Sequence, residues 1–438
     1  MKTLYERVKS LHSQVSTLIN AGVTDEEPIS DELKNACLFI EPKQDREIIK
    51  THKVKIEPNS HMKVQIEKLF NYRRYIWNQG LNIWNERYEA FTILEDENTR
   101  PDEYSVRNDI VASKQDWQYE LSSRVLQKTS VSLGNAWKRF FNPNLPNSAR
   151  PKFKSKKNYK PTFTTDRARI VKGKLVLDKP QTINKALWYP IRMLEAPRFE
   201  GKLLTCTITE RADGLYASLA FETEHEVTPP KKQGIAGVDV NVKRFNYNGG
   251  AINIYPDKLE RYYQRITNYQ KMLARKRQEN PHNYKTKRYT KVKTKLRRDY
   301  QKVSDLQNDI LQKFTTQLIL DYPEIHIEDL NVHGMMMSKR MGKNLHRSLF
   351  GRLSEVLKYK SEWNERELVL VDRFYPSTQI CSECGFQKTA DGYGGKQTLH
   401  GDSIHHEHQT YYCYNCGAVL DRDENAVSNI INFKPKAG

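Results

Sequence analysis

Two pairs of cysteines, each spaced CxxC, place the strongest constraint on how this chain folds. One pair lies in "CSECG" (Cys381, Cys384) and the other in "CYNCG" (Cys413, Cys416). Each pair can chelate a metal through one tight turn, and four thiolates satisfy tetrahedral Zn²⁺ with no open position. The sequence therefore predicts one structural zinc site, with a surface loop between the pairs. That loop carries histidines that could each replace a cysteine, although four cysteines make this unnecessary: His400, His405, His406 and His408.

The other two cysteines and the apolar content indicate where such a chain works. Cys37 and Cys206 are isolated, so the cysteine pattern is typical of a metal site in a reducing compartment and not of a disulfide framework. Cys206 lies in a strand pattern and is expected in a core. No apolar run approaches the length of a bilayer span, and the first residues lack a signal-peptide core. We expect a protein of a reducing compartment, with no membrane partner.

The charge of the chain points to an anionic partner. The net charge is +19, and many of the 24 tyrosines alternate with Lys and Arg. This combination suits contact with phosphates and stacking on bases, so it favours nucleic acid over a merely basic surface. The candidate nucleic-acid contacts are Arg73, Arg74, Lys152, Lys154, Lys156, Lys157, Arg275, Lys276, Arg277 and Arg422.

The first half of the chain predicts a helical lobe and a small sheet or β-barrel. Residues 1–49 are polar and suggest no chemistry. A short strand at "THKVKIE" precedes a long helix for which Ser60 is a plausible N-cap, and helical periodicity resumes in "DWQYELSSRVLQKTSVSLGNAWKRFF". Short alternating stretches follow, and "RADG" joins "LLTCTITE" to "YASLAFETE" as a hairpin.

The second half predicts a sheet flanked by helices. "GIAGVDVNVKRFNYNGGAINIY" reads as two strands around an Asn-Gly-Gly turn. A very basic helical stretch, 261–302, comes next and is expected to lie along phosphates, although a solvated helical hairpin is the alternative. An apolar helix, the strand "EIHIEDL", a further helix and the strand "LVLVDRF" then alternate, as in an α/β layer.

Three carboxylates occupy positions that are costly without a partner. Asp239 interrupts the apolar strand "IAGVDVNV", and Glu328 ends the strand "IHIE". In "DRDENAVSNIINF" the apolar residues mark the helix face that packs on the sheet, and Asp423 shares that face whereas Asp421 lies off it. Spacing therefore selects Asp423 as the inward carboxylate.

Carboxylates from two strands and one helix would form an oxygen-rich site for Mg²⁺ or Mn²⁺. Two such ions can stabilise the attacking and leaving oxygens of a phosphodiester during hydrolysis. Each acid alone reads more simply as a cap, a turn or a surface residue. Their order on strand, strand and helix is the stronger signal.

Four segments together resemble the TnpB family of transposon-encoded RNA-guided nucleases, which is related to miniature type V CRISPR effectors and to Fanzor proteins. They are "GVDVNVK", "IHIEDLNVHGM", "LVLVDRFYPSTQICSECG" and "CYNCGAVLDRDENAVSNI", and the resemblance covers roughly residues 50–434. It implies a multi-domain α+β protein with a RuvC-type, RNase H-like nuclease domain and a zinc-bearing insert that binds target nucleic acid. The N-terminal lobe would be a wedge β-barrel interrupted by a helical recognition domain.

The resemblance also implies the site and its partners. Its acidic triad falls on Asp239, Glu328 and Asp423, which would hold Mg²⁺ or Mn²⁺. A guide RNA would pair with one strand of double-stranded target DNA beside a short motif read by the N-terminal lobe. A monomer is favoured, and the family implies a protein of the bacterial cytoplasm or nucleoid. The chain departs from the family at Asn241, where Gly is usual, in a hairpin one residue short and in the long loop between the CxxC pairs.

The expected domains follow from these motifs. They are 1–49, an extension of unknown role; 50–65 and 146–230, the two parts of the wedge; 66–145, the helical recognition domain; 231–375, the first part of the nuclease domain; 376–418, the zinc-binding insert; and 419–438, the last nuclease helix.

Three other functions are compatible with these motifs. A nuclease-silent, RNA-guided DNA-binding repressor would typically lack triad acids, and all three are present here. A small type V CRISPR effector would carry the same motifs. A transposase that moves DNA itself would require strand transfer.

Overall fold

The computed structural model describes residues 46–144, 148–157, 160–330, 349–388 and 409–434. The chain divides into two units, Met1–Arg46 and Glu47–Gly438, and the description below concerns the second. Predictions made for Cys37, for the extension before residue 46 and for the four histidines between the CxxC pairs lie outside the described residues.

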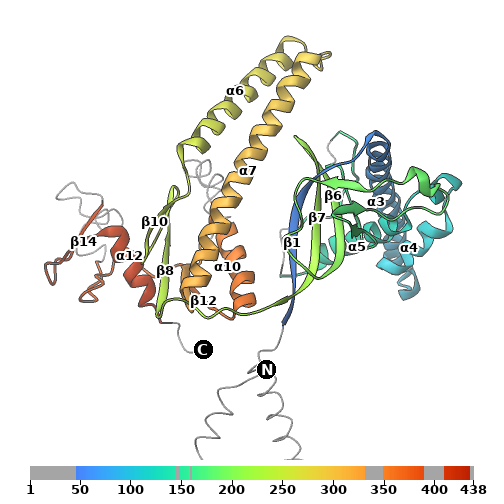
Figure 1. Cartoon of the computed structure of the whole chain (residues 1–438). Helices are drawn as coiled ribbons and strands as arrows, with labels where there is room; N and C mark the ends of the chain where they lie inside the picture. The colour runs from blue at the N-terminus through green and yellow to red at the C-terminus, as the bar shows by residue number, and fades with distance from the viewer. Residues whose placement is uncertain (1–45, 145–147, 158–159, 331–348, 389–408, 435–438) are drawn as a thin grey trace, which may run out of the picture. The chain divides into compact units, whose positions relative to one another are not determined.

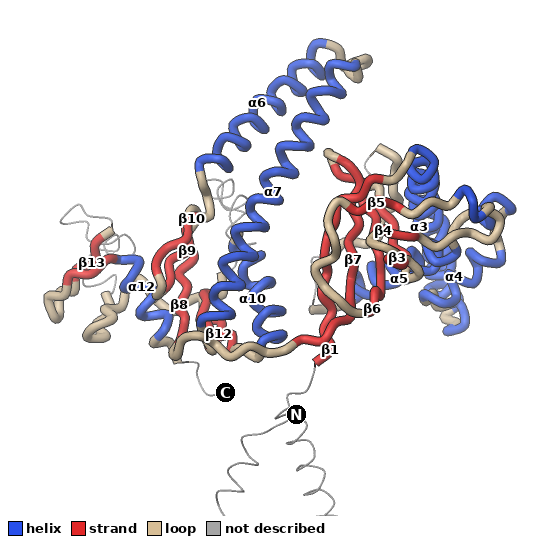
Figure 2. The backbone as a smooth tube through the Cα atoms, viewed as in Figure 1, coloured by secondary structure: helices blue, strands red, loops and turns tan. Residues whose placement is uncertain are grey.

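The first half forms helices and one seven-stranded sheet (Figures 1 and 2). Its strands follow the order β2-β6-β7-β1-β5-β4-β3. The helices are α3 (Ser60–Leu94), α4 (Glu103–Ala112) and α5 (Ser123–Phe141), with short 3-10 turns at Glu97–Thr99, Asp116–Glu120 and Lys185–Leu187. The strands are β1 (Arg46–Glu57), β2 (Thr162–Thr165), β3 (Arg169–Val171), β4 (Lys174–Val176), β5 (Ile191–Met193), β6 (Lys202–Arg211) and β7 (Gly214–His225).

Sequence patterns anticipated much of this half. The hairpin around "RADG" is confirmed, because β6 pairs antiparallel with β7 from Lys202 to Arg211. The predicted N-cap was wrong by one residue: Asn59 caps α3, and its side-chain oxygen accepts from the Met62 amide at 2.8 Å. Within the described residues β2 and β3 do not pair with each other, so a closed barrel stays a prediction.

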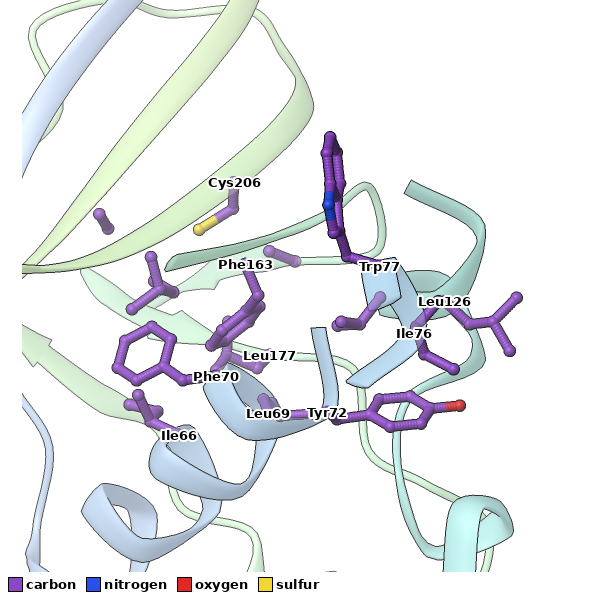
Figure 3. Close-up of a cluster of buried hydrophobic side chains, with 14 of the residues drawn as sticks. Ile66, Leu69, Phe70, Tyr72, Ile76, Trp77, Leu126, Phe163, Leu177 and Cys206 are labelled. Carbon is purple, nitrogen blue, oxygen red and sulfur yellow. The ribbon is translucent and has the colours of Figure 1, made fainter. Parts of the chain in front are cut away.

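The core of this half lies between α3 and the sheet, as Figure 3 shows. Ile66, Leu69 and Phe70 of the helix face Phe163 of β2 and Cys206 of β6. Cys206 is fully buried, which confirms that it belongs to a core. The apolar positions of α3 recur at helical spacing, and burying that face against the sheet is what stabilises so long a helix.

The second half contains a five-stranded sheet of order β10-β9-β8-β11-β12. β8 pairs antiparallel with β9 and β9 with β10, whereas β11 runs parallel to both β8 and β12. The two strands expected before the basic stretch are three, because the Asn241 amide donates to the Arg244 carbonyl and turns the chain back. The strands are β8 (Ile235–Val240), β9 (Arg244–Tyr247), β10 (Gly250–Asn253), β11 (Glu324–Glu328) and β12 (Glu367–Val371).

Helices cover both faces of this sheet. Ala236, Val238 and Val240 of β8 share a core with α7 (Lys287–Asp321) and α10 (Phe350–Asn364). Since side chains alternate along a strand, Gly237 and Asp239 face the opposite side, where α12 (Arg422–Ile431) packs. The basic stretch forms α6 (Asp257–Glu279) and the first half of α7, a helical hairpin that continues directly into the apolar helix.

A small two-stranded sheet completes the described chain. β13 (Thr410–Tyr412) pairs antiparallel with β14 (Val419–Asp421), immediately before α12. The second CxxC pair lies between these two strands.

Candidate functional site

Three elements bring the predicted carboxylates to one edge of the five-stranded sheet. Asp239 lies near the end of β8 and Glu328 is the last residue of β11, which is the parallel neighbour of β8. Asp423 lies in the first turn of α12, which packs on β8. Asp239 and Asp423 are 7% and 6% exposed, so both carboxylates are withdrawn from most of the solvent. Burial of acids this close together requires compensating groups.

Gly237 permits the approach of α12 to the sheet. A Cβ atom at this position would lie 2.7 Å from both Ile431 Cγ1 and the Val427 carbonyl oxygen. Only glycine therefore lets the helix lie this close to β8. The glycine in "IAGVDV" thus sets where Asp423 sits relative to Asp239.

Two asparagine amides hold one oxygen of Asp239. Asn241 Nδ2 donates to Asp239 Oδ2 at 2.8 Å, and Asn246 Nδ2 donates to the same oxygen at 3.4 Å. Asn246 lies directly opposite Asp239 in the β8–β9 ladder. Among the described residues no hydrogen bond reaches Asp239 Oδ1, so that oxygen is available to a ligand.

Asp423 is held by two arginines. Arg244 Nη2 lies 2.6 Å from Asp423 Oδ2, and Arg422 Nη2 lies 3.3 Å from Oδ1. Asp421 is the N-cap of α12, and its Oδ1 accepts from the backbone amides of Asp423 and Glu424. The structure therefore turns Asp423 inward and leaves Asp421 at the exposed cap.

Within the described part of the chain, Asp239 and Glu328 form no ion pair with a cationic side chain. Burial raises the pKa of Asp239 to about 6, and the nearby Asp423 carboxylate adds to this effect, although the nearby Arg422 partly opposes the rise. Burial and the Asp239 carboxylate raise the pKa of Glu328 to about 7, while the Ser377 hydroxyl, which donates to Oε1 at 3.0 Å, opposes the rise. A bound cation would favour the ionised forms, which is the situation of a divalent-metal site.

Asp239 and Glu328 open to solvent through a cleft of about 540 Å³, whereas Asp423 lines a separate cavity of about 440 Å³ together with Arg244 and Asn246. Asp239, Asn241 and Glu328 line the cleft together with the exposed Phe374 and with Arg373. The carboxylate oxygens of the three acids do not all lie within 4.8 Å of one another in this structure. Among the described residues, only the ligand atoms of the four cysteines lie that close together.

The four predicted cysteines converge. Their sulfurs all lie within 4.8 Å of one another, with Cys381 and Cys416 3.8 Å apart and Cys384 and Cys413 3.5 Å apart. Tetrahedral Zn–S bonds of about 2.3 Å place sulfurs about 3.8 Å apart. This donor set therefore fits one structural zinc ion.

The two CxxC turns are built alike. The Cys381 amide donates to the Phe386 carbonyl and the Cys413 amide to the Ala418 carbonyl. Each turn ends in a glycine, Gly385 or Gly417, with φ of 75°. This left-handed conformation favours glycine, which explains the G that follows each CxxC motif.

The predicted nucleic-acid contacts are distributed over several surfaces. Lys152, Lys156, Lys157, Arg275 and Arg277 are exposed, and Arg73, Arg74 and Lys276 are half-buried. Lys154 differs from the others, because its ammonium lies 3.0 Å from the centre of the Trp77 ring and burial lowers its pKa to about 7. Arg422 contacts Asp423.

Several residues of this site were missed by reasoning from the sequence. They are Arg244, Asn246, Ser377, Asn425 and Asn429. Asn246 could have been found from the strand register opposite Asp239. Asn425 and Asn429 recur at helical spacing beside the apolar face of α12, which is an unusual place for amides.

Family models match three parts of the chain. A model described as "Probable transposase" matches residues 218–339, a "Cas12f1-like, TNB domain" matches 350–430 and a "Helix-turn-helix domain" matches 48–92. The last description does not fit the structure here, since residues 48–92 form β1 and one uninterrupted helix, α3.

Curated relatives cover most of the chain. A Streptomyces pristinaespiralis protein, provisionally named an RNA-guided DNA endonuclease, is 28% identical over 71% of this chain and 71% of its own length. The Escherichia coli protein InsQ, with the same provisional name, is 23% identical over 77% of this chain and 83% of its own length. TnpB-like protein L79 of Acanthamoeba polyphaga mimivirus is 28% identical over 35% of this chain and 28% of its own length.

The chain is similar to the TnpB family. The models described as "Probable transposase" and "Cas12f1-like, TNB domain" cover the four segments that suggested this family, in the same order along the chain. A solved Cas12f1–sgRNA–target DNA complex aligns with a TM-score of 0.48 and 12% identity, covering 88% of this chain and 99% of that chain. Among the described residues, no helix is both long and apolar enough to span a membrane.

Proposed function

We propose that this chain is an RNA-guided DNA endonuclease whose nuclease site is Asp239, Glu328 and Asp423. The observation that carries the proposal is the convergence of three acids from β8, β11 and α12, two of them with raised pKa values. The names of two relatives that cover over two thirds of the chain point to the same activity.

We propose that the second half is a RuvC-type, RNase H-like nuclease domain. Three antiparallel strands followed by two parallel ones, in the order β10-β9-β8-β11-β12, support this assignment. The zinc-bearing segment is inserted between the last strand, β12, and the last helix, α12. The domain boundaries given above and the wedge and helical recognition parts of the first half belong to the same proposal.

The chemistry follows from how the acids are held. Mg²⁺ or Mn²⁺, when bound, would activate water and neutralise charge on the departing 3′ oxygen. Asp239, Glu328 and Asp423 would supply the ligand oxygens. Asn241 and Asn246 fix the orientation of Asp239 by holding its other oxygen, and Ser377 does the same for Glu328.

The basic surfaces would bind the nucleic acids. The hairpin of α6 and α7 presents a dense row of Lys and Arg with few acids, which suits a phosphate backbone. We propose that a guide RNA and double-stranded target DNA occupy these surfaces and that pairing with the guide supplies sequence selection. Arg275, Lys276 and Arg277 are the contacts proposed on α6.

The proposal is tested with the full-length protein carrying the RNA that co-purifies with it. We expect cleavage of matched DNA that requires Mg²⁺ or Mn²⁺, and no cleavage by Asp239→Ala or Glu328→Ala, while both variants still bind guide and target. Full cutting by either variant would contradict the mechanism. Products with only cleaved ends, and no joined strands, would argue against a transposase.

One observation favours the nuclease-silent repressor as a second candidate. Arg244 lies 2.6 Å from Asp423 and competes with a metal for that carboxylate. Tight binding of matched DNA without any divalent-dependent cutting by the wild-type protein would select this alternative.

A further inference from the structure

One short segment touches both halves of the carboxylate site. Residues 377–382 lead into the first CxxC turn and contact Glu328 on one side and α12 on the other. Ser377, only 4% exposed, donates its hydroxyl to Glu328 Oε1 at 3.0 Å. Because α12 carries Asp423, this segment contacts both Glu328 and the helix that holds Asp423.

Two buried asparagines join α12 to the segment. Asn425 Oδ1 accepts from the Ser382 amide at 2.9 Å, and its Nδ2 donates to the Ile380 carbonyl at 2.8 Å. Asn429 Nδ2 donates to the carbonyls of both Ser377 and Ile380 at 2.7 Å. Each asparagine is 2% exposed. Replacing either one leaves buried backbone groups unpaired, which carries a substantial penalty.

These contacts give α12 a second fixed face. Its apolar residues, including Ala426 and Ile430, pack on the sheet beside Gly237. Asn425 and Asn429 are one helical turn apart and so share a different side, toward the segment. Hydrogen bonds depend on both distance and direction, so those made by Asn425 and Asn429 restrict the position of α12 in addition to its packing on the sheet.

The other end of the segment belongs to the cysteine cluster. Cys381 lies inside it, between the Ile380 carbonyl and the Ser382 amide that the asparagines contact. The fully buried Tyr411, beside the second CxxC pair, donates its hydroxyl to the Gln379 carbonyl at 3.0 Å. A closed cysteine cluster therefore fixes the backbone to which α12 and Glu328 are attached.

We propose that Ser377, Asn425 and Asn429 are positioning residues that use the cysteine-bearing segment 377–382 to hold Glu328 and Asp423 at the separation required for divalent-metal binding. The cysteine cluster would then support the carboxylate site in addition to its own fold. This inference rests on the proposed function, in that it takes the three acids to be the metal site. Neighbours of metal ligands commonly change metal affinity or activity by about 10–100-fold when they are altered.

The test compares four variants of the full-length protein with its bound RNA. Asn429→Ala and Ser377→Ala remove the contacts, Ser377→Thr keeps the hydroxyl, and Ser428→Ala is the control. The Ser428 hydroxyl bonds only to Glu424 of its own helix in the described contacts. Mn²⁺ affinity is measured by electron paramagnetic resonance, zinc content by mass spectrometry and DNA cleavage by single-turnover kinetics.

We expect Asn429→Ala and Ser377→Ala to retain zinc and target binding but to bind Mn²⁺ about tenfold or more weakly and to cut correspondingly slowly. Ser377→Thr should bind Mn²⁺ more tightly and cut faster than Ser377→Ala, because it keeps the hydroxyl, and Ser428→Ala should match the wild type. Wild-type Mn²⁺ affinity in both alanine variants would overturn the inference, as would a loss of thermal stability alone. If Asn429→Ala does not fold, Ser377→Ala decides the question, since it removes one hydroxyl.

Failure of the proposed function gives a different result. A wild-type protein that binds no Mn²⁺ and cuts no matched DNA overturns the proposed function and this inference together. A wild-type protein that binds and cuts, with Asn429→Ala and Ser377→Ala indistinguishable from it, overturns only the positioning role.

Discussion

Asp239→Asn should make the protein more stable when no divalent metal is present, even though it removes a catalytic acid. Burial and the neighbouring Asp423 raise the pKa of Asp239 from an ordinary 3.8 to about 6. A difference of about 2 pKa units corresponds to about 3 kcal/mol at about 1.36 kcal/mol per unit. Burying the new amide group costs about 1 kcal/mol. The expected net gain in the free energy of unfolding is about 2 kcal/mol.

The dependence on pH follows from the sign of the shift. Because the folded pKa lies above the unfolded one, the folded state binds more protons between pH 3.8 and about pH 6, and wild-type stability falls as pH rises through this window. The advantage of Asp239→Asn should be absent near the lower limit, grow through the window and stay constant above it. Adding Mg²⁺ should stabilise the wild type and not the variant.

The assay must report on the nuclease half alone. Hydrogen exchange of the β8 peptide is followed by mass spectrometry across a urea series in divalent-free buffer at about pH 8, above the window. Asp423→Asn is the matched control. It leaves Arg244 and Arg422 without their acid, so no gain in stability is expected. A less stable Asp239→Asn in divalent-free buffer, or equal gains in both variants, would refute the reasoning.

Three further predictions follow from the same geometry. Gly237→Ala places a methyl group 2.7 Å from Ile431 and Val427, so it should lower the free energy of unfolding by about 1–3 kcal/mol and reduce cleavage strongly. Gly351→Ala is the control, because its methyl group meets nothing within 4 Å, and it should change neither quantity. Denaturation and cleavage assays compare the two variants. Arg244→Gln removes a cation that competes for Asp423, so it should lower the Mg²⁺ concentration needed for half-maximal cleavage. Lys243→Gln removes an exposed charge one residue away and should leave that concentration unchanged. A higher Mg²⁺ concentration for half-maximal cleavage in Arg244→Gln would contradict this prediction. The cleavage rate at low Mg²⁺ should rise between about pH 6 and about pH 7 as Asp239 and Glu328 ionise. Rate profiles at several Mg²⁺ concentrations should show this rise move to lower pH as the Mg²⁺ concentration increases. A pH profile that does not change with Mg²⁺ would exclude these acids as ligands.

The sequence alone determined the features that repeat locally. The CxxC spacing fixed four thiols and the glycines that follow them, because a chelating turn needs both within a few residues. Strand and helix periodicity likewise indicated which side of α12 faces the sheet and therefore singled out Asp423 over Asp421. These inferences needed no knowledge of which strands are neighbours.

Only the tertiary structure decided what surrounds the acids. Asn246 reaches Asp239 through the register of β8 and β9, and Ser377 reaches Glu328 across 49 positions of sequence. Asn425 and Asn429 bond to the backbone of residues 377–382, which lie more than 40 positions away in the sequence. These contacts depend on strand register and on how segments distant in sequence pack together. Neither property produces a periodic pattern in the sequence.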